Sequence, residues 1–151
     1  MAIPLSDLIA ALPSAHVEGY ADLAVEAIVS DSRRVRPGSL FVAYRGVAAD
    51  GHDYIPQAMA RGAVAVVAER PAAGLAVPLV DVPDGREALA YLSAAWYGFP
   101  ARHMTIVGIT GTDGKTTTCN LLHTILVAAG RRAGLVTPLN AVIGHRVLDP
   151  G

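Results

Sequence analysis

Apolar residues form short continuous runs in some parts of the chain and helically spaced positions in others, with turn-forming residues between them. Continuous runs predict four buried strands, at residues 27–30, 40–44, Ala63–Ala68 and 77–82. Helical spacing behind a capping residue predicts three helices, which begin at Ser6, Asp53 and Asp84. Strands that alternate with helices indicate an α/β layered domain whose sheet is covered on both faces.

A second pattern of the same kind follows. An apolar run at 104–109 predicts a strand, a glycine-containing turn comes next, 116–129 has the spacing of a helix, and Leu135 lies in a further short strand. We therefore expect a first domain at 1–102 and the start of a P-loop-type βαβ domain at 103–151. Because fewer residues follow the turn than the ~50 of the smallest usual domains, we expect this second domain to be incomplete.

Composition narrows the class of protein. The chain has 151 residues, is 52% hydrophobic and 17% charged, and has a formal net charge of -1. This balance argues against a disordered chain and against a nucleic-acid partner. One cysteine excludes a disulfide framework, and no apolar run approaches the ~20 residues of a membrane helix. We expect a cytoplasmic protein without membrane insertion, whose oligomeric state the sequence does not specify.

The sharpest motif is Thr-Gly-Thr-Asp-Gly-Lys-Thr-Thr-Thr at 110–118, between the predicted strand and helix. Gly111 and Gly114 allow a tight turn of backbone N–H groups, and the helix start adds its positive dipole end. Lys115 is the only lysine among 12 basic residues, and it can reach outer phosphates, while Thr116 can ligate Mg²⁺. The motif predicts a nucleotide-binding loop in which Lys115 and Thr116 serve catalysis and Thr116 binds the metal.

Other reactive side chains have simpler interpretations. Asp113 would repel phosphates if it pointed inward, so we expect it to point outward as a turn residue. We expect Cys119 to be a small buried hydrophobe and His123 to be a packed helical residue. No metal site is predicted from the remaining histidines, His16, His52, His103 and His145.

The turn at 110–118 resembles the ATP-binding loop of the Mur ligases, the cytoplasmic enzymes that build the peptide of bacterial cell walls. The first domain is similar to the UDP-binding domain of the same family. The residues that carry this second resemblance are Asp31-Ser32-Arg33, 37–43, Gly46, 50–55, Ala58 and 62–63. The ordered series covers most of the chain and is more specific than one glycine motif.

Two branches of the family share this series. One adds the third amino acid to UDP-N-acetylmuramoyl-L-alanyl-D-glutamate, and the other adds D-alanyl-D-alanine afterwards. Thr112 and Cys119 are more similar to the first branch, the MurE-type tripeptide synthetases, and the second branch is the alternative. The resemblance implies a ligase that phosphorylates the substrate carboxylate with ATP, after which an amine attacks the acyl phosphate.

The resemblance also implies roles for particular residues. ATP with Mg²⁺ would be held by Gly111, Thr112, Asp113, Gly114, Lys115, Thr116 and Thr117. The UDP-N-acetylmuramoyl-peptide would contact Ser30, Ser32, Val47, Ala48 and Ala49. From the residues alone, Ser30 and Ser32 are ordinary turn residues, and Val47 departs from the polar residue that some members carry.

Several features argue against catalysis by this chain alone. Family members carry a carbamylated lysine and further magnesium ligands in later parts of the chain, and Lys115 is the only lysine here. We therefore expect this chain to bind its substrates rather than to ligate them. A non-catalytic UDP-sugar-binding module is the alternative from another class, and a small P-loop NTPase is disfavoured because Asp149 is the only acidic residue after Asp113. The residues do not indicate which amino acid is added.

Overall fold

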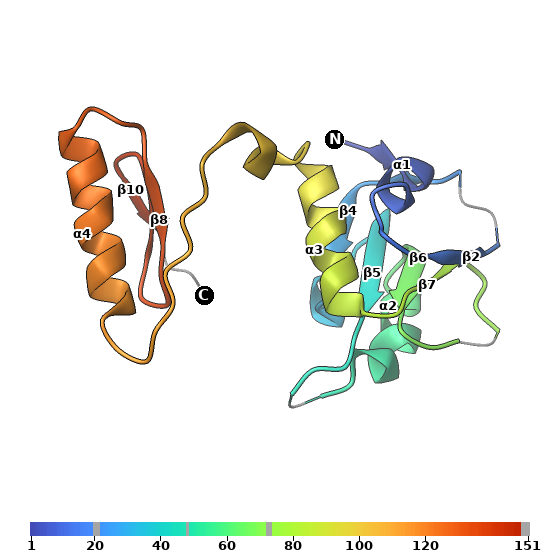
Figure 1. Ribbon diagram of the computed structural model, residues 1–151. Helices are drawn as coiled ribbons and strands as arrows, with labels where there is room; N and C mark the ends of the chain where they lie inside the picture. The colour runs from blue at the N-terminus through green and yellow to red at the C-terminus, as the bar shows by residue number, and fades with distance from the viewer. Residues whose placement is uncertain (20–21, 48, 72–73, 149–151) are drawn as a thin grey trace. The chain divides into compact units, whose positions relative to one another are not determined.

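The computed structural model describes residues 1–19, 22–47, 49–71 and 74–148. The chain forms two compact units, Met1–Met104 and Thr105–Gly151 (Figure 1). Each unit has its own sheet, and each is described by itself below.

The first unit is built on a five-stranded sheet in the order β2-β7-β6-β5-β4. Its strands are β2 (His16–Glu18), β4 (Ala27–Val29), β5 (Ser39–Ala43), β6 (Ala63–Ala68) and β7 (Leu79–Asp81). The strands β4 to β7 are parallel and lie side by side in chain order, while β2 pairs antiparallel with β7 at the edge. The short strands β1 (Ile3–Pro4) and β3 (Ala24–Val25) form a separate antiparallel pair.

Three helices cover the two faces of this sheet, α1 (Leu5–Ile9), α2 (Ile55–Ala60) and α3 (Gly85–Trp96). Alternate residues of β5 and β6 point to opposite faces, as the pleat of a strand requires. One set packs with α1 and α3, and includes Leu40, Val42, Ala65 and Val67. The other set packs with α2, and includes Phe41, Ala43, Val66 and Ala68. The α/β class and the doubly covered sheet are confirmed.

Two predicted helix starts are wrong. The first helix begins at Leu5 after Pro4, and the Leu5 amide donates to the carbonyl oxygen of Leu23 at 2.7 Å, so Ser6 is not needed as a cap. Asp50 rather than Asp53 opens the next helical segment, because its carboxylate accepts from the His52 amide at the start of the 3₁₀ turn Gly51–Tyr54.

The predicted cap of α3 is confirmed. The Asp84 carboxylate accepts hydrogen bonds from the amides of Arg86 and Glu87 at 2.8 and 2.9 Å. Two further 3₁₀ turns, Ser32–Arg34 and Pro100–His103, lie in the loop after β4 and after α3. The strand predicted at 77–82 is shorter and spans Leu79–Asp81, although Pro78 and Val82 still make backbone hydrogen bonds to β6.

The second unit contains α4 (Lys115–Ala128) and the strands β8 (Gly134–Val136), β9 (Ala141–Ile143) and β10 (Arg146–Leu148). The strands form an antiparallel sheet in the order β10-β9-β8. The predicted helix and the strand at Leu135 are confirmed, whereas 104–109 forms no strand. A strand needs a neighbour for its backbone groups, and in the described part of this unit β8 pairs only with β9.

Candidate functional site

The carboxyl ends of four parallel strands meet at one edge of the first sheet, which we call the carboxyl edge. The segments that leave it are 30–34 after β4, 44–47 after β5, 69–70 after β6 and 82–84 after β7. In open α/β sheets, ligands bind outside the carboxyl ends of the strands. The fold therefore brings Ser30 and Ser32 to the same edge as Val47 and Ala49.

The segment after β5 turns back on itself. Its two arms, 44–46 and 49–51, together form what we call the β5 turn. The Gly51 amide donates to the Tyr44 carbonyl oxygen, and the Gly46 amide donates to the Ala49 carbonyl oxygen, both at 2.9 Å. A Cβ on Gly46 would lie 2.8 Å from the Ala49 oxygen. The arms thus need glycine for their close approach, and the base of the turn is fixed.

The candidate substrate residues differ in their surroundings. Ser30 and Ala49 are exposed, and Val47 at the β5 turn is 99% exposed. Ser32 is buried, and its hydroxyl donates to Gln57 Oε1 on α2 at 2.6 Å. Ala48 lies outside the described residues. These residues therefore offer backbone groups, the exposed hydroxyl of Ser30, and the buried hydroxyl oxygen of Ser32, which retains lone pairs for accepting.

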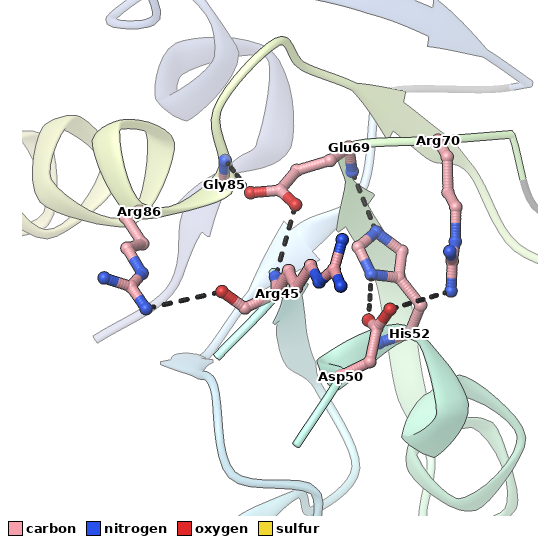
Figure 2. Close-up of polar contacts among 7 residues, drawn as sticks. All are labelled: Arg45, Asp50, His52, Glu69, Arg70, Gly85 and Arg86. Carbon is pink, nitrogen blue, oxygen red and sulfur yellow. Dashed lines mark hydrogen bonds and ion pairs between the residues drawn. The ribbon is translucent and has the colours of Figure 1, made fainter. Parts of the chain in front are cut away.

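A polar network that the sequence analysis did not identify ties the carboxyl edge together (Figure 2). Glu69, the first residue after β6, accepts from the Gly85 amide at 2.9 Å and from the Arg45 amide at 3.2 Å. The Arg86 guanidinium donates to the Arg45 carbonyl oxygen at 3.3 Å and lies over the Tyr44 ring. One carboxylate thus joins the loops after β5 and β7.

His52 forms the second half of this network. Its Nε2 faces the Glu69 amide at 3.1 Å and must accept from it, so Nε2 carries no proton. The proton of the neutral ring then lies on Nδ1, which donates to Asp50 Oδ1 at 2.6 Å. The backbone amide and the ring of His52 hold the pKa of Asp50 below its usual value, and Arg70 adds an ion pair at 3.0 Å.

An ion pair orders the loop after β4. Asp31 caps the 3₁₀ turn by accepting from the Arg33 amide at 2.9 Å, and its carboxylate also pairs with the Arg33 guanidinium at 2.8 Å. The side-chain hydrogen bond from Arg33 is the main cause that lowers the pKa of Asp31 to about 2. The Arg33 carbonyl oxygen accepts from Arg61, which links this loop to the end of α2.

The predicted nucleotide loop precedes α4 in the second unit. Gly114 has the left-handed φ of 74° at the N-cap of α4, and no side chain caps this helix. The first hydrogen bond of the helix runs from the Thr118 amide to the Gly114 carbonyl oxygen. The amides of Lys115, Thr116 and Thr117 therefore have no acceptor four residues earlier within the helix, as an anion-binding helix start requires.

Lys115 crosses this loop. Its ammonium donates to the carbonyl oxygens of Gly111 and Thr112, the latter at 3.0 Å. An ammonium has three donors, so one remains for a phosphate oxygen. Thr116 is half-buried in the first turn of α4, and Asp113 is exposed. The free amides and the remaining ammonium donor fit an anion such as a phosphate, and Thr116 is one of the hydroxyls at this helix start.

One prediction for a side chain of α4 is corrected, and it concerns Cys119. Cys119 is half-buried rather than buried, because the sheet covers α4 on one side only and α4 has no buried residue. His123 lies in α4 as expected and is half-buried, and its buried Nε2 has no hydrogen-bond partner in the described part of the chain. Among the described residues, no group of three histidine, cysteine or acidic side chains could hold a metal, and no helix is long and apolar enough to span a membrane.

Comparison with known proteins identifies the class that this fold and these loops define. Residues 24–97 match the model of the Mur ligase family, catalytic domain. The chain is 54% identical over 125 residues to a UDP-N-acetylmuramyl-tripeptide synthetase of Roseiflexus sp. (strain RS-1), which covers 82% of this chain and 25% of that protein. The chain belongs to the Mur ligase family.

Two further similarities concern the branch of the family. A UDP-N-acetylmuramoyl-L-alanyl-D-glutamate--2,6-diaminopimelate ligase of Geobacillus thermodenitrificans (strain NG80-2) is 44% identical over 142 residues, which is 94% of this chain and 29% of that protein. A MurF ligase from Thermotoga maritima, solved in complex with ADP, is 36% identical with a TM-score of 0.53, over 68% of this chain and 23% of that one. The chain thus spans less than a third of the length of these relatives.

Proposed function

We propose that this chain supplies the UDP-sugar site and the nucleotide loop of an ATP-dependent ligase that adds the third amino acid to UDP-N-acetylmuramoyl-L-alanyl-D-glutamate. The observation that carries the proposal is the pairing of two features in one chain. A fixed turn lies at the carboxyl edge of a parallel sheet, and an uncapped helix start with a crossing lysine follows in the second unit. The 54% identity to a tripeptide synthetase supports the choice of branch.

The proposed roles follow from what each residue offers. The exposed Ser30 hydroxyl and the exposed backbone at Val47 and Ala49 would receive the diphosphate, and the Ser32 hydroxyl oxygen would accept from the uracil N–H. Lys115 and the first amides of α4 would hold the ATP phosphates, with Thr116 toward Mg²⁺. ATP supplies the phosphoryl group that activates the substrate carboxylate for attack by the amino acid. Cytoplasmic location is part of the same proposal, since these substrates are cytoplasmic in the family.

Thermal unfolding with separate ligands tests the proposal. We expect UDP-N-acetylmuramoyl-L-alanyl-D-glutamate to raise the free energy of unfolding of the first unit by about 2.7 kcal/mol at one hundred times its Kd. Mg-ATP should stabilise the second unit by a similar amount. A folded chain that gains no stability from the UDP-sugar would contradict the proposed function and favour a module without this ligand.

The D-alanyl-D-alanine-adding branch is the second candidate, because the similarity to the Thermotoga maritima MurF ligase extends over 68% of this chain. That branch uses a substrate that already carries the third amino acid. Parallel titration with the dipeptide and tripeptide forms of the UDP-sugar separates the two. Tighter binding of the dipeptide form supports the proposal, and tighter binding of the tripeptide form supports the alternative.

A further inference from the structure

We propose that Glu69 is a positioning residue that holds the β5 turn in the conformation that receives the UDP-sugar. The inference rests on the proposed function, because it concerns how that same site is shaped. Glu69 is half-buried at the carboxyl edge and does not belong to the β5 turn. Its contacts nevertheless reach both arms of that turn.

The first arm is held by the Glu69 carboxylate. Oε2 accepts from the Arg45 amide at 3.2 Å, and Oε1 accepts from the Gly85 amide at 2.9 Å (Figure 2). Both oxygens are therefore occupied by backbone donors, one from the β5 turn and one from the first residue of α3. Hydrogen bonds to an ionised carboxylate are the stronger class, so this link restrains the arm more than a neutral acceptor would.

The second arm is held through the Glu69 backbone. The Glu69 amide donates to His52 Nε2, and the opposite ring nitrogen of His52 donates to the Asp50 carboxylate. Asp50 pairs with Arg45 in an antiparallel bridge across the turn. One residue thus fixes the positions of both Arg45 and Asp50, the pair from which the exposed residues Val47 and Ala49 project.

The close packing around the turn makes this restraint effective. A Cβ on Gly51 would lie 2.7 Å from the Tyr44 carbonyl oxygen, and a Cβ on Gly85 would lie 2.7 Å from the Tyr44 Cβ. The backbones of Gly51 and Gly85 therefore lie directly against Tyr44, and neither position has room for a side chain. Loss of the Glu69 carboxylate frees the Arg45 amide at the point where this packed base meets the exposed part of the turn.

The test is the variant Glu69→Gln, because glutamine keeps the shape but presents an NH₂ donor to one of the two amides. We expect the Kd for UDP-N-acetylmuramoyl-L-alanyl-D-glutamate to rise about tenfold, equivalent to about 1.4 kcal/mol. Calorimetric titration is done on the complete chain, well below the unfolding transition of each variant. Glu18→Gln is the matched control, because Glu18 is exposed on the outer strand β2 and takes no part in the network at the carboxyl edge. The Kd of this variant for the UDP-sugar should equal that of the unaltered chain.

A purely structural role would lower the melting temperature of Glu69→Gln and leave its Kd for the UDP-sugar unchanged in the folded protein. That result would overturn the inference. If the unaltered chain itself does not bind the UDP-sugar, the proposed function fails and the inference falls with it. If Glu69→Gln does not fold, Glu69→Asp takes its place, because its shorter side chain withdraws the carboxylate from the amides of Arg45 and Gly85, and the same rise in Kd is expected.

Discussion

Similar apolar sequences form a buried strand in the first unit of this chain but an exposed segment without strand structure in the second. In the first unit, β5 is buried along its whole length, between α1 and α3 on one face and α2 on the other. In the second unit, the apolar run at 104–109 forms no strand, and Ile106 and Val107 are 66% and 60% exposed. Apolar character alone therefore does not decide burial.

The contrast between helices and strands explains the difference. A helix satisfies its backbone hydrogen bonds within its own segment, so α4 forms although none of its residues is buried. A strand depends on a neighbour, and β5 has one on each side whereas 104–109 has none in the described part of the chain. Local patterns thus predict helices in both units but strands only where the partners are present.

The largest expected effect is on the free energy of unfolding, and it compares a buried side chain of β5 with an exposed one of the 104–109 segment. Phe41→Ala removes a fully buried ring from β5 and should lower the free energy of unfolding by about 3–5 kcal/mol. Ile106→Ala should change it by less than about 0.5 kcal/mol, because the side chain is already mostly exposed. Urea unfolding followed by circular dichroism and by Trp96 fluorescence measures both. A loss at Ile106 as large as that at Phe41 would show that the 104–109 segment is packed in solution.

The next effect separates the two candidate ligand sites. Lys115→Ala should remove the stabilisation by Mg-ATP, about 2.7 kcal/mol at one hundred times the Kd, because it deletes the ammonium that crosses the loop. Stabilisation by the UDP-sugar should remain. Arg132→Ala, an exposed basic residue after α4, is the control and should leave both ligands effective. Loss of both stabilisations in Lys115→Ala would contradict two independent sites.

A smaller effect compares the starts of two helices. Asp84→Ala removes the carboxylate that caps α3 and should cost about 1 kcal/mol of stability. Asp53→Ala is the matched control, because Asp53 provides no cap in the structure, and its cost should be within about 0.5 kcal/mol. Thermal unfolding of the two variants gives the comparison. Equal costs would mean that the Asp84 cap contributes little to stability, and that α3 could form without a side-chain cap as α4 does.

The smallest effect concerns the loop after β4. The carboxyl of Asp31 should titrate with a pKa of about 2, and Arg33→Ala should raise this pKa toward its ordinary value of 3.8. Since the folded pKa is depressed, the stabilising contribution is present above pH 3.8 and is lost as the pH falls toward 2. Carbon NMR of the Asp31 carboxyl follows the titration. A midpoint that does not move in Arg33→Ala would rule out the ion pair as its cause.

Elements with strong local signals could be predicted from the sequence. The strand Ala63–Ala68 matches its predicted bounds because it is a continuous apolar run behind Gly62, and α3 begins at its predicted cap, Asp84. The short strands β1, β2 and β3 were not predicted, because their pairing with distant segments and not their sequence makes them strands. His16–Glu18 pairs with residues 79–81, far along the chain.

The network at the carboxyl edge was not predicted for the same reason. Glu69 contacts Arg45 and Gly85, which lie 24 and 16 residues away along the chain. A usable signal was present, since Arg45, Glu69 and Arg70 are polar residues that closely follow buried strands. Parallel strands bring such residues to one edge, so the pattern indicates a shared polar layer even where it does not give the partners.

The order of the strands also bears on how the chain folds as it is synthesised. Strands β4, β5, β6 and β7 lie side by side in the order in which they leave the ribosome, so each new strand can add to the last one formed. Strand β2 is made before all of them, but among the described strands its one partner is β7, the last. Residues 16–18 therefore reach their place beside β7 only after residue 81 has emerged, so β2 is the first strand of this sheet to be made and the last that can join it.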